Sequence, residues 1–338
     1  MNSIKKMMLS GALGCLISGM AYADGSSPQP VKPYWQDIQV VAVNKEKPRS
    51  SFMSYADRET ALTSRFEKSP YYSLLNGTWK FFFVDSYKDL PQNITDPSVN
   101  TSSWDDITVP GNWEVQGHGV AIYTNHGYEF KPKNPQPPLL PEANPVGVYR
   151  RDIEIPANWD NRDIYLHIGG AKSGLYVYLN GKEVGYSEDS KNPAEFLINK
   201  YLQPGKNVLT LKIFRWSTGS YLECQDFWRM SGIERDVFLW SQPKASIQDF
   251  RVVSTLDDTY TNGIFKLAVD LKNHTQETKN LNVGYELLDA KGNLMASEAN
   301  DIWVSPASPQ TASFEYDLKN VAPWSAEHPN LYKFCLLY

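Results

Sequence analysis

Short runs of alternating polar and apolar residues, punctuated by glycine, proline and asparagine, constrain the fold of this chain more than any other feature. They include "GVYRRDIEIP", "IYLHIGG", "LYVYLNGKEVGY" and "NVLTLKIFRW". Successive side chains of a strand point to opposite faces, so each run predicts a β-strand. In the first run Val148 and Arg150 fall on one face and Tyr149 on the other, which predicts a half-buried strand.

The turns between these runs indicate how the strands connect. Asn180 and Gly181 separate two strand-type segments, and a two-residue hairpin of this kind needs positive φ at both positions. Many short strands joined by such turns predict an all-β fold. We expect a jelly-roll β-sandwich over residues 66–242. An N-terminal arm over 24–65 precedes it, with one short helix expected over 57–66.

A second group of strand candidates follows Gln242 and Pro243. The segments "SIQDFRVVSTL", "GIFKLAVDLKN", "LNVGYELL", "NLMAS", "TASFEYDL" and "NLYKFCLLY" have the spacing of an immunoglobulin-like sandwich. Such a sandwich usually has about seven strands, and six candidates are present. We therefore expect residues 243–338 to form a truncated immunoglobulin-like β-sandwich, with an apolar edge strand over 331–338 left unpaired.

The first 23 residues have the pattern of a signal peptide. Lys5 and Lys6 are basic, residues 7–20 are mostly apolar, and "AYA" at 21–23 matches a small-residue cleavage site. The apolar run is too short to span a bilayer. Cleavage before Cys15, as in a lipoprotein, is the alternative, although "ALG" is a poor match to that pattern. We expect export to the periplasm or the medium, with no membrane span.

Composition narrows the classes of function. The formal net charge of −5 argues against a nucleic acid as a partner. The sequence has no cysteine and histidine cluster with metal-ligand spacing and no glycine-rich phosphate loop. Its five histidines sit in no recognisable nucleophile setting, so no catalytic residue is assigned to this chain. Cys224 and Cys335 are far apart in sequence and indicate no disulfide framework.

The stretch "RWSTGSYLECQDFWRMSGIERDV", which begins at Arg215, crowds charges among tryptophans. Hydrolysis of a glycoside with retention needs two carboxyls about 5–5.5 Å apart. Glu223 and Asp226 would lie about 10 Å apart in an extended segment. Residue chemistry alone therefore favours a structural interpretation, because partly buried acids are usually paired. In it, both acids pair with Arg215, Arg229 or Arg235 and fix the loop beside buried tryptophans.

The same stretch resembles the signature of the sugar-binding domain of glycoside hydrolase family 2, in particular of its large β-galactosidases. The segments "LNGTWKF", "ITVPGNWEVQGHGVAIYTN", "NPVGVYRRDIEIP", "YLNGKEVGYSEDSKNPAEFLINKYLQPGKNVLTL" and "PWSAEHPNLY" also match, in the family's order. Together they cover nearly everything from Tyr34 to Tyr332. The resemblance implies a jelly roll, an immunoglobulin-like domain and then a TIM barrel with the catalytic glutamates. By this resemblance, we expect the chain to end before that barrel.

The resemblance also implies roles for two residues. The acid that matches Asp226 reaches the active site, where it helps to hold a sodium ion and contacts the galactosyl group. Asn125, in "IYTN", likewise contacts the sugar. A hard cation takes oxygen ligands, and a sugar hydroxyl can share its shell. Without the resemblance, Asn125 would be interpreted as a loop-capping amide. Magnesium is implied for the complete enzyme, but Thr218 and Cys224 each replace an acid that relatives carry.

We therefore expect the N-terminal half of an exported β-galactosidase-like retaining glycosidase that acts on β-galactoside sugars. The chain alone is expected to be inactive and to need no cofactor, and oligomerisation is expected only of the complete enzyme. One alternative is a β-glucuronidase or β-mannosidase of the same architecture. The other is a free-standing carbohydrate-binding or adhesion module, which is expected to end on a finished sandwich.

Overall fold

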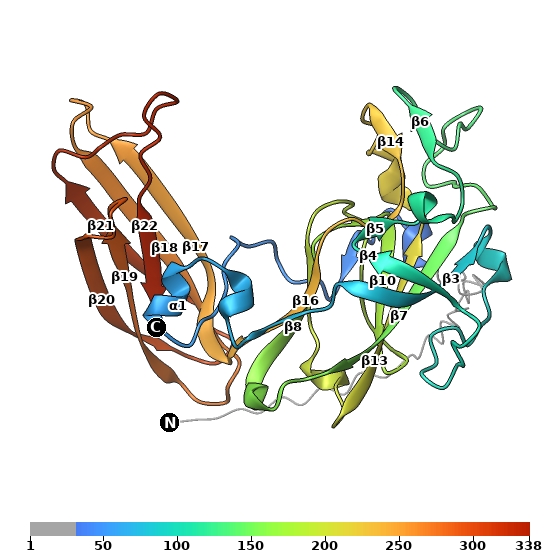
Figure 1. Cartoon of the computed structure of the whole chain (residues 1–338), viewed down its shortest axis with the longest axis horizontal. Helices are drawn as coiled ribbons and strands as arrows, with labels where there is room; N and C mark the ends of the chain where they lie inside the picture. The colour runs from blue at the N-terminus through green and yellow to red at the C-terminus, as the bar shows by residue number, and fades with distance from the viewer. Residues whose placement is uncertain (1–31) are drawn as a thin grey trace, which may run out of the picture. The chain divides into compact units, whose positions relative to one another are not determined.

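The computed structural model describes residues 32–338, so the signal peptide predicted over 1–23 lies outside the described residues. Residues 33–338 form one compact unit that is nearly all β. Strands β1 to β16 build a first sandwich and strands β17 to β22 build a second (Figure 1). This confirms the predicted fold class. Between residues 32 and 338, no helix is long and apolar enough to cross a membrane.

Two antiparallel sheets form the first sandwich. The larger sheet has the strand order β1 (Ala42–Val43), β11 (Lys182–Ser187), β10 (Gly174–Leu179), β13 (Lys206–Phe214), β7 (Val146–Glu154), β3 (Gly77–Val84) and β4 (Asp105–Val109). The smaller sheet has the order β12 (Ala194–Leu197), β8 (Arg162–Ile168), β16 (Val237–Pro243) and β2 (Tyr72–Leu74).

Shorter elements complete this sandwich. One small sheet has the order β5 (Gly111–Asn112), β15 (Gly232–Ile233) and β9 (Ala171–Lys172). A two-stranded ribbon pairs β6 (Ile122–Thr124) with β14 (Phe227–Arg229). The 3-10 turns are η1 (Tyr34–Gln36), η2 (Phe66–Lys68), η3 (Tyr87–Asp89), η4 (Glu114–Gln116), η5 (Ala157–Trp159), η6 (Asn199–Tyr201) and η7 (Thr218–Tyr221).

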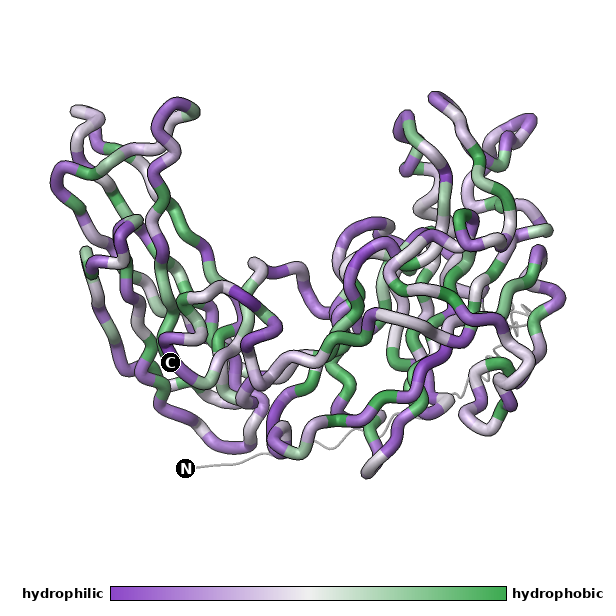
Figure 2. Tube along the Cα trace, viewed as in Figure 1, coloured by the Kyte–Doolittle hydropathy of each residue, from purple (hydrophilic) through white to green (hydrophobic). Residues whose placement is uncertain are grey.

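The core of the first sandwich lies between its two large sheets. Phe81 and Leu211 come from the larger sheet and Leu166 and Leu239 from the smaller one, and all four are fully buried. Burying a side chain of this size contributes about 1.5–3 kcal/mol. Figure 2 shows the apolar residues gathered along the strands and the hydrophilic residues gathered at the turns.

Strand β7 departs from the half-buried pattern that its alternation predicted. Val148 and Arg150, on the face expected to be exposed, are 0% and 5% exposed. Val148 packs in a second apolar cluster with Trp35 of the N-terminal arm and with Trp104. Arg150 donates a hydrogen bond to the Ile94 carbonyl at 2.7 Å. The arm and the loop before β4 therefore cover this face, which the pattern of one strand does not reveal.

Two local predictions are resolved by backbone geometry. The hairpin between β10 and β11 is confirmed, since φ is 53° at Asn180 and 77° at Gly181. The helix predicted over 57–66 is shorter than expected and forms α1 (Arg58–Leu62). The Asp57 side chain caps it by accepting from the Thr60 backbone N–H at 2.8 Å. The helix stops because Ser64 adopts a positive φ of 56°.

The second sandwich contains the six predicted strands. One sheet has the order β17 (Ala245–Leu256), β18 (Gly263–Asn273) and β21 (Gln310–Leu318), and the other β20 (Leu294–Val304), β19 (Lys279–Leu288) and β22 (Lys333–Leu337). Strand β20 is longer than predicted, because it continues through "EANDIWV" to Val304. This largely polar second half lies at a sheet edge, so it lacks the apolar alternation by which strands were predicted. Strand β22 pairs with β19 on one side, which corrects the prediction of an unpaired strand, and is outermost on the other.

Candidate functional site

The ribbon of β6 and β14 carries both residues that the resemblance selects, and it lies at one end of the first sandwich (Figure 1). Its strands are antiparallel, with Thr124 opposite Phe227. Asn125 follows directly after β6, and Asp226 lies directly before β14. Because the two strands are antiparallel, Asn125 and Asp226 both lie at the same end of the ribbon. Strand pairing thus brings together two residues that are far apart in the sequence.

The ribbon has one exposed face and one covered face. Tyr123 and Trp228 lie opposite each other and are 56% and 54% exposed. Asn125 and Asp226 are exposed as well. The Tyr123 hydroxyl reaches Asp226, so Tyr123, Trp228 and Asp226 form the outer face of the ribbon, and the exposed Asn125 borders it directly after β6. The intervening residues are half-buried or buried and face the sandwich.

Polar and aromatic groups are joined on this outer face. The Tyr123 hydroxyl donates to Asp226 Oδ1 at 3.0 Å, and this hydrogen bond raises the pKa of Tyr123. The rings of Tyr123 and Trp228 are in contact, with centroids 5.6 Å apart. Asn125 Oδ1 lies 2.9 Å from His126 Nδ1. The outer face therefore offers a carboxylate, an amide, a phenol and an indole, which together suit a ring that bears hydroxyl groups.

The covered face is held to the sandwich by two arginines. Arg229 is 1% exposed, and its guanidinium donates to the Glu223 carbonyl at 2.8 Å and to the Thr124 carbonyl at 3.5 Å. Arg215 Nη2 donates to the carbonyls of Val120 at 3.0 Å and Arg229 at 3.1 Å. These bonds fix both strands, and a two-stranded ribbon alone is only marginally stable in water.

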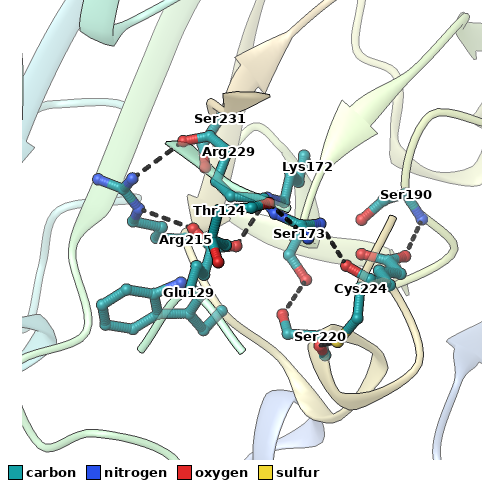
Figure 3. Close-up of polar contacts among 12 residues, drawn as sticks. Thr124, Glu129, Lys172, Ser173, Ser190, Arg215, Ser220, Cys224, Arg229 and Ser231 are labelled. Atoms are coloured by element: carbon teal, nitrogen blue, oxygen red, sulfur yellow. Dashed lines mark hydrogen bonds and ion pairs between the residues drawn. The ribbon is translucent and has the colours of Figure 1, made fainter. Parts of the chain in front are cut away.

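Glu129 balances the charge of Lys172 and Arg215 beneath the ribbon (Figure 3), and Glu114 is a second buried glutamate beside Arg215. Glu129 Oε1 accepts from Lys172 Nζ at 2.7 Å, and the two side chains are 6% and 1% exposed. Glu129 Oε2 lies 3.6 Å from Arg215 Nε, and Glu114 Oε1 lies 3.7 Å from Arg215 Nη1. Burial raises the pKa of Glu114. Charges this deep need partners, so the network anchors the loop that follows β6.

The arginine clamp predicted for Glu223 and Asp226 is wrong. Within residues 32–338, neither carboxylate forms an ion pair with an arginine. Glu223 Oε1 accepts from the Ser190 backbone N–H at 3.1 Å, while its Oε2 is buried without a hydrogen-bond partner among residues 32–338. Burial accordingly raises the pKa of Glu223. The arginines bind carbonyl oxygens and other glutamates, so the loop is oriented by the Glu223 carbonyl, which accepts from Arg229, and by the Glu223 side chain, which accepts from Ser190.

Sequence reasoning missed the two aromatic residues of the outer face. Trp228 was grouped with the buried tryptophans, but only its neighbours in that stretch, Trp216 and Trp240, are buried, at 8% and 1% exposure. The signal was present as two-residue spacing, because Tyr123 precedes Asn125 by two positions and Trp228 follows Asp226 by two. That spacing places each aromatic beside a polar residue on a strand.

The described residues fit only part of the sodium site that the resemblance implies. Asp226 Oδ1 accepts from Tyr123, and a second carboxylate oxygen suits a hard cation. Residues 32–338 contain no group of three or more histidine, cysteine or acidic side chains placed to hold a metal ion. The outlying magnesium site fits worse, because the Thr218 hydroxyl is buried and donates to Glu188 Oε1 at 2.6 Å.

Two family models match most of the chain. The model of the sugar binding domain of the glycosyl hydrolases family 2 matches residues 72–243. A second model, glycosyl hydrolases family 2, matches residues 245–337. The boundary between the two matches coincides with the end of β16 at Pro243 and the start of β17 at Ala245.

The chain is also similar to curated β-galactosidases. It is 38% identical to that of Priestia megaterium over 308 residues, which cover 90% of this chain and 30% of the relative. It is 37% identical to that of Halalkalibacterium halodurans, over 89% of this chain and 29% of the relative. For the Vibrio cholerae β-galactosidase the identity is 35%, over 90% and 30%. The chain therefore spans only 29–30% of the length of these relatives.

Solved structures of β-glucuronidases share the fold. The Bacteroides uniformis β-glucuronidase has a TM-score of 0.64 at 21% identity, over 78% of this chain and 30% of that chain. The Bifidobacterium dentium β-glucuronidase, complexed with coumarin-3-O-glucuronide, has a TM-score of 0.57 at 18% identity, over 77% and 44%. At such identities the likeness describes the fold alone.

Proposed function

This chain belongs to glycosyl hydrolase family 2, and from that premise we propose that it is the N-terminal part of an exported β-galactosidase-like retaining glycosidase. In this proposal the chain supplies side chains that contact the terminal β-D-galactosyl unit, and the catalytic carboxyls lie in another part of the protein. The name and the length of the curated relatives support this division of labour, since the chain spans 30% of the Priestia megaterium β-galactosidase.

One observation carries the proposal: Asn125 and Asp226 are both exposed and lie at the same end of the ribbon, directly after β6 and directly before β14. An amide donates and accepts hydrogen bonds, and a carboxylate accepts them, so the pair matches neighbouring hydroxyl groups of a sugar. Hydrogen bonds to a charged group are worth about 1.5–3 kcal/mol. The ion-pair network beneath the ribbon fixes this geometry before a sugar binds, which reduces the entropy lost on binding.

The work of these side chains is recognition, while bond cleavage takes place elsewhere. Tyr123 holds Asp226 Oδ1, so the second carboxylate oxygen of Asp226 is the one that accepts from a galactosyl hydroxyl. The Asn125 amide nitrogen donates to another hydroxyl oxygen. Asp226 would hold a sodium ion through its free carboxylate oxygen, and the ion would supply further oxygen coordination for a sugar hydroxyl. Contacts to the non-reacting part of a substrate hold the reacting bond in position for catalysis.

A β-glucuronidase or β-mannosidase of the same architecture is the runner-up, and the β-glucuronidases of similar fold are the observation behind it. A glucuronide carries its own carboxylate. Within the described chain Asp226 has only a phenol as its partner, so it would repel a second negative charge. This favours a neutral sugar. The third candidate function is that of a free-standing carbohydrate-binding module, which would bind a sugar without being part of an enzyme.

Sugar binding by the purified chain tests the proposal directly. Ligand-observed NMR is recorded with methyl β-D-galactopyranoside, its mannoside and its glucuronide, in sodium chloride and in choline chloride. We expect the galactoside to bind best, and Asp226→Asn to weaken binding at least about tenfold. Sodium should strengthen binding only when the chain is joined to the remaining length of a relative. Glu315→Gln, which changes an exposed acid of the second sandwich, is the matched control. Preference for the glucuronide, or galactoside binding untouched by Asp226→Asn, would contradict the proposal.

Activity measurements separate an enzyme part from a binding module. We expect the purified chain not to release nitrophenol from an aryl galactoside above the buffer rate, because removing catalytic groups costs several orders of magnitude. Covalent connection to the remaining length of a relative such as the Priestia megaterium enzyme should restore turnover. Hydrolysis by the chain alone, after host galactosidase has been removed, would show that the catalytic groups are here.

Export is tested by the N-terminus of the protein recovered from cells. The pattern of residues 1–23 predicts cleavage after Ala23 and a mature chain that begins at Asp24. Mass spectrometry of the periplasmic fraction should find that terminus. Recovery of Met1 from this fraction, or of a lipid on Cys15, would exclude soluble export.

A further inference from the structure

We propose that Tyr123 and Trp228 form an aromatic platform for a second ring, the sugar or aryl group on the leaving-group side of the galactosyl unit. This inference rests on the proposed function, since it takes the terminal unit to lie against Asn125 and Asp226. It extends that function by naming a second binding subsite and the chemistry of its ligand: a ring with one apolar face.

Exposure is the first reason to assign a role to these rings. Tyr123 and Trp228 are 56% and 54% exposed, while the alternate residues of the same strands are half-buried or buried. Burying an aromatic side chain lowers its free energy. Two exposed aromatic rings paired across one ribbon therefore present apolar surface that a ligand can cover. Their ring planes are inclined by 56°, so neither ring covers the face of the other.

The spacing of the two pairs suits adjacent rings. Tyr123 and Trp228 form one cross-strand pair, and Asn125 and Asp226 lie two positions away from them, just beyond the paired residues of β6 and β14. Residues two apart on a strand are separated by about 6.6–6.8 Å, which is the scale of one sugar ring. A galactosyl unit at the polar pair therefore places the group attached to its anomeric oxygen beside the aromatic pair.

The polar groups argue for a sugar or aryl glycoside and against a protein surface as the occupant. A protein that covered the aromatic pair would also bury Asp226, whose one partner in the described chain is the Tyr123 hydroxyl. Burying a carboxylate without a cation is costly. A glycoside covers the rings with its apolar face and leaves the carboxylate bonded to hydroxyls or in water. The hydrogen bond from Tyr123 to Asp226 also fixes one ring of the platform.

The test compares two probes on the full chain, free galactose and phenyl β-D-galactopyranoside, by ligand-observed NMR titration. An aromatic contact is worth about 0.5–1.5 kcal/mol, so the phenyl galactoside should bind about threefold to tenfold more tightly than galactose. Trp228→Ala should remove this advantage, so that the phenyl galactoside no longer binds more tightly than galactose. Tyr123→Phe should retain most of the advantage, because it keeps the ring and loses only the hydroxyl.

Trp303→Ala is the matched control, because Trp303 is 66% exposed on β20 of the second sandwich. It should change neither affinity. Thermal melts of all variants, compared with the parent, confirm that each is folded, and exposed positions of this kind usually alter stability by less than about 0.5 kcal/mol. An equal loss of phenyl galactoside binding in Trp303→Ala would overturn the platform.

The outcomes separate this inference from the proposed function. If galactose binds but the phenyl group adds nothing, the platform is wrong and the function stands. If phenyl glucoside binds as well as phenyl galactoside and Trp228→Ala weakens both, the platform stands and the galactoside assignment fails. If no probe binds, both fail. If Trp228→Ala instead abolishes self-association in sedimentation experiments, the rings cover a second copy of the chain and the platform is wrong.

Discussion

The two sandwiches of this chain handle charge in opposite ways. The first buries Lys172, Arg215 and Arg229 with Glu114 and Glu129, in contact with the ribbon that carries the candidate site. The second has an apolar cluster at its centre and exposes the ion pairs between its own residues, while the buried Lys272 Nζ lies 3.8 Å from Asp163 Oδ2 of the first sandwich. The polar residues that it does bury lie together, at the start of β17 and the end of β18: Ser246, Lys272 and Asn273.

This difference shows what each sandwich has to hold in place. Apolar packing is non-directional, so the core of the second sandwich stabilises its sheets without fixing a particular side chain. The ribbon of the first sandwich is too small to bury a core of its own. Directional contacts from Arg215 and Arg229 to backbone carbonyls fix it instead. Buried charge therefore marks the place where position matters most, although buried ion pairs are weak evidence for stability.

The largest expected effect comes from removing a buried cation of the first sandwich. Arg215→Ala leaves Glu114 and Glu129 buried beside one partner fewer, and breaking a buried pair from one side costs about 3–5 kcal/mol. The matching change in the second sandwich is Lys266→Ala, which breaks a pair whose side chains are 52% and 61% exposed. We expect that variant to stay within about 0.5 kcal/mol of the parent.

Urea unfolding, followed by tryptophan fluorescence and by circular dichroism, measures both changes. Near-equal losses in the two variants would break the contrast between the sandwiches. A loss in Arg215→Ala below about 1 kcal/mol would mean that water enters beneath the ribbon and screens the glutamates, because exposed pairs are worth no more than that.

A smaller effect is expected at Glu223, where burial has left a carboxylate oxygen without a partner. Its pKa is raised, so the folded state holds the proton more tightly than the unfolded state does. The ionised carboxylate therefore destabilises the fold at neutral pH, and this penalty disappears as the pH falls below about 4. Glu223→Gln should raise the free energy of unfolding by about 1–3 kcal/mol at pH 7.

The pH profile of Glu223→Gln identifies the cause. Urea unfolding at several pH values measures the difference in free energy of unfolding between Glu223→Gln and the parent. This difference should shrink as the pH is lowered through the raised pKa of Glu223. Glu315→Gln, at an exposed acid of the second sandwich, should show no gain at any pH. A Glu223→Gln variant that is less stable than the parent at pH 7 would mean that a cation pairs with this carboxylate in solution.

The second sandwich has its own weak point at β22, which is the outermost strand of its sheet. Leu337 and Tyr338 are 36% and 43% exposed there, and an apolar edge strand is a template for pairing with another chain. We expect the chain to associate with itself as its concentration rises. Leu337→Lys should reduce this association several-fold, because a charge on the edge opposes strand pairing. Sedimentation velocity over a range of concentrations measures it.

Leu294→Lys, at the start of the opposite edge strand β20, serves as the control for a charge placed elsewhere. If both substitutions reduce association equally, added net charge is responsible and not the edge of β22. If neither substitution reduces association, the chains associate through the first sandwich and not through the edge of β22.

The smallest expected effect on stability is at Asp226, three positions from Glu223. Asp226 is exposed and accepts one hydrogen bond, from Tyr123. Asp226→Asn should therefore change the free energy of unfolding by less than about 0.5 kcal/mol. A melting temperature equal to that of the parent, together with the loss of galactoside binding, would assign Asp226 to recognition. Lost stability with retained binding would return it to a structural role.

Much of the fold follows from local patterns. The alternation of "NVLTLKIFRW" and the paired Asn180 and Gly181 determine a strand and a hairpin, because each depends only on neighbouring residues. Alternation failed at Val148, since a strand pattern does not say what covers its outer face. Alternation also failed to predict the second half of β20, because the polar residues of this edge segment do not alternate with apolar ones.

The candidate site divides in the same way. The sequence by itself, through its resemblance to a family, selected Asn125 and Asp226 and supplied the two-residue spacing of Tyr123 and Trp228 beside them. Only the tertiary structure decided that these residues lie together on one ribbon, and that Arg215 pairs with Glu114 and Glu129 and not with Glu223. The reason is physical: which charges become partners depends on which distant segments meet, and burial then makes those pairs obligatory.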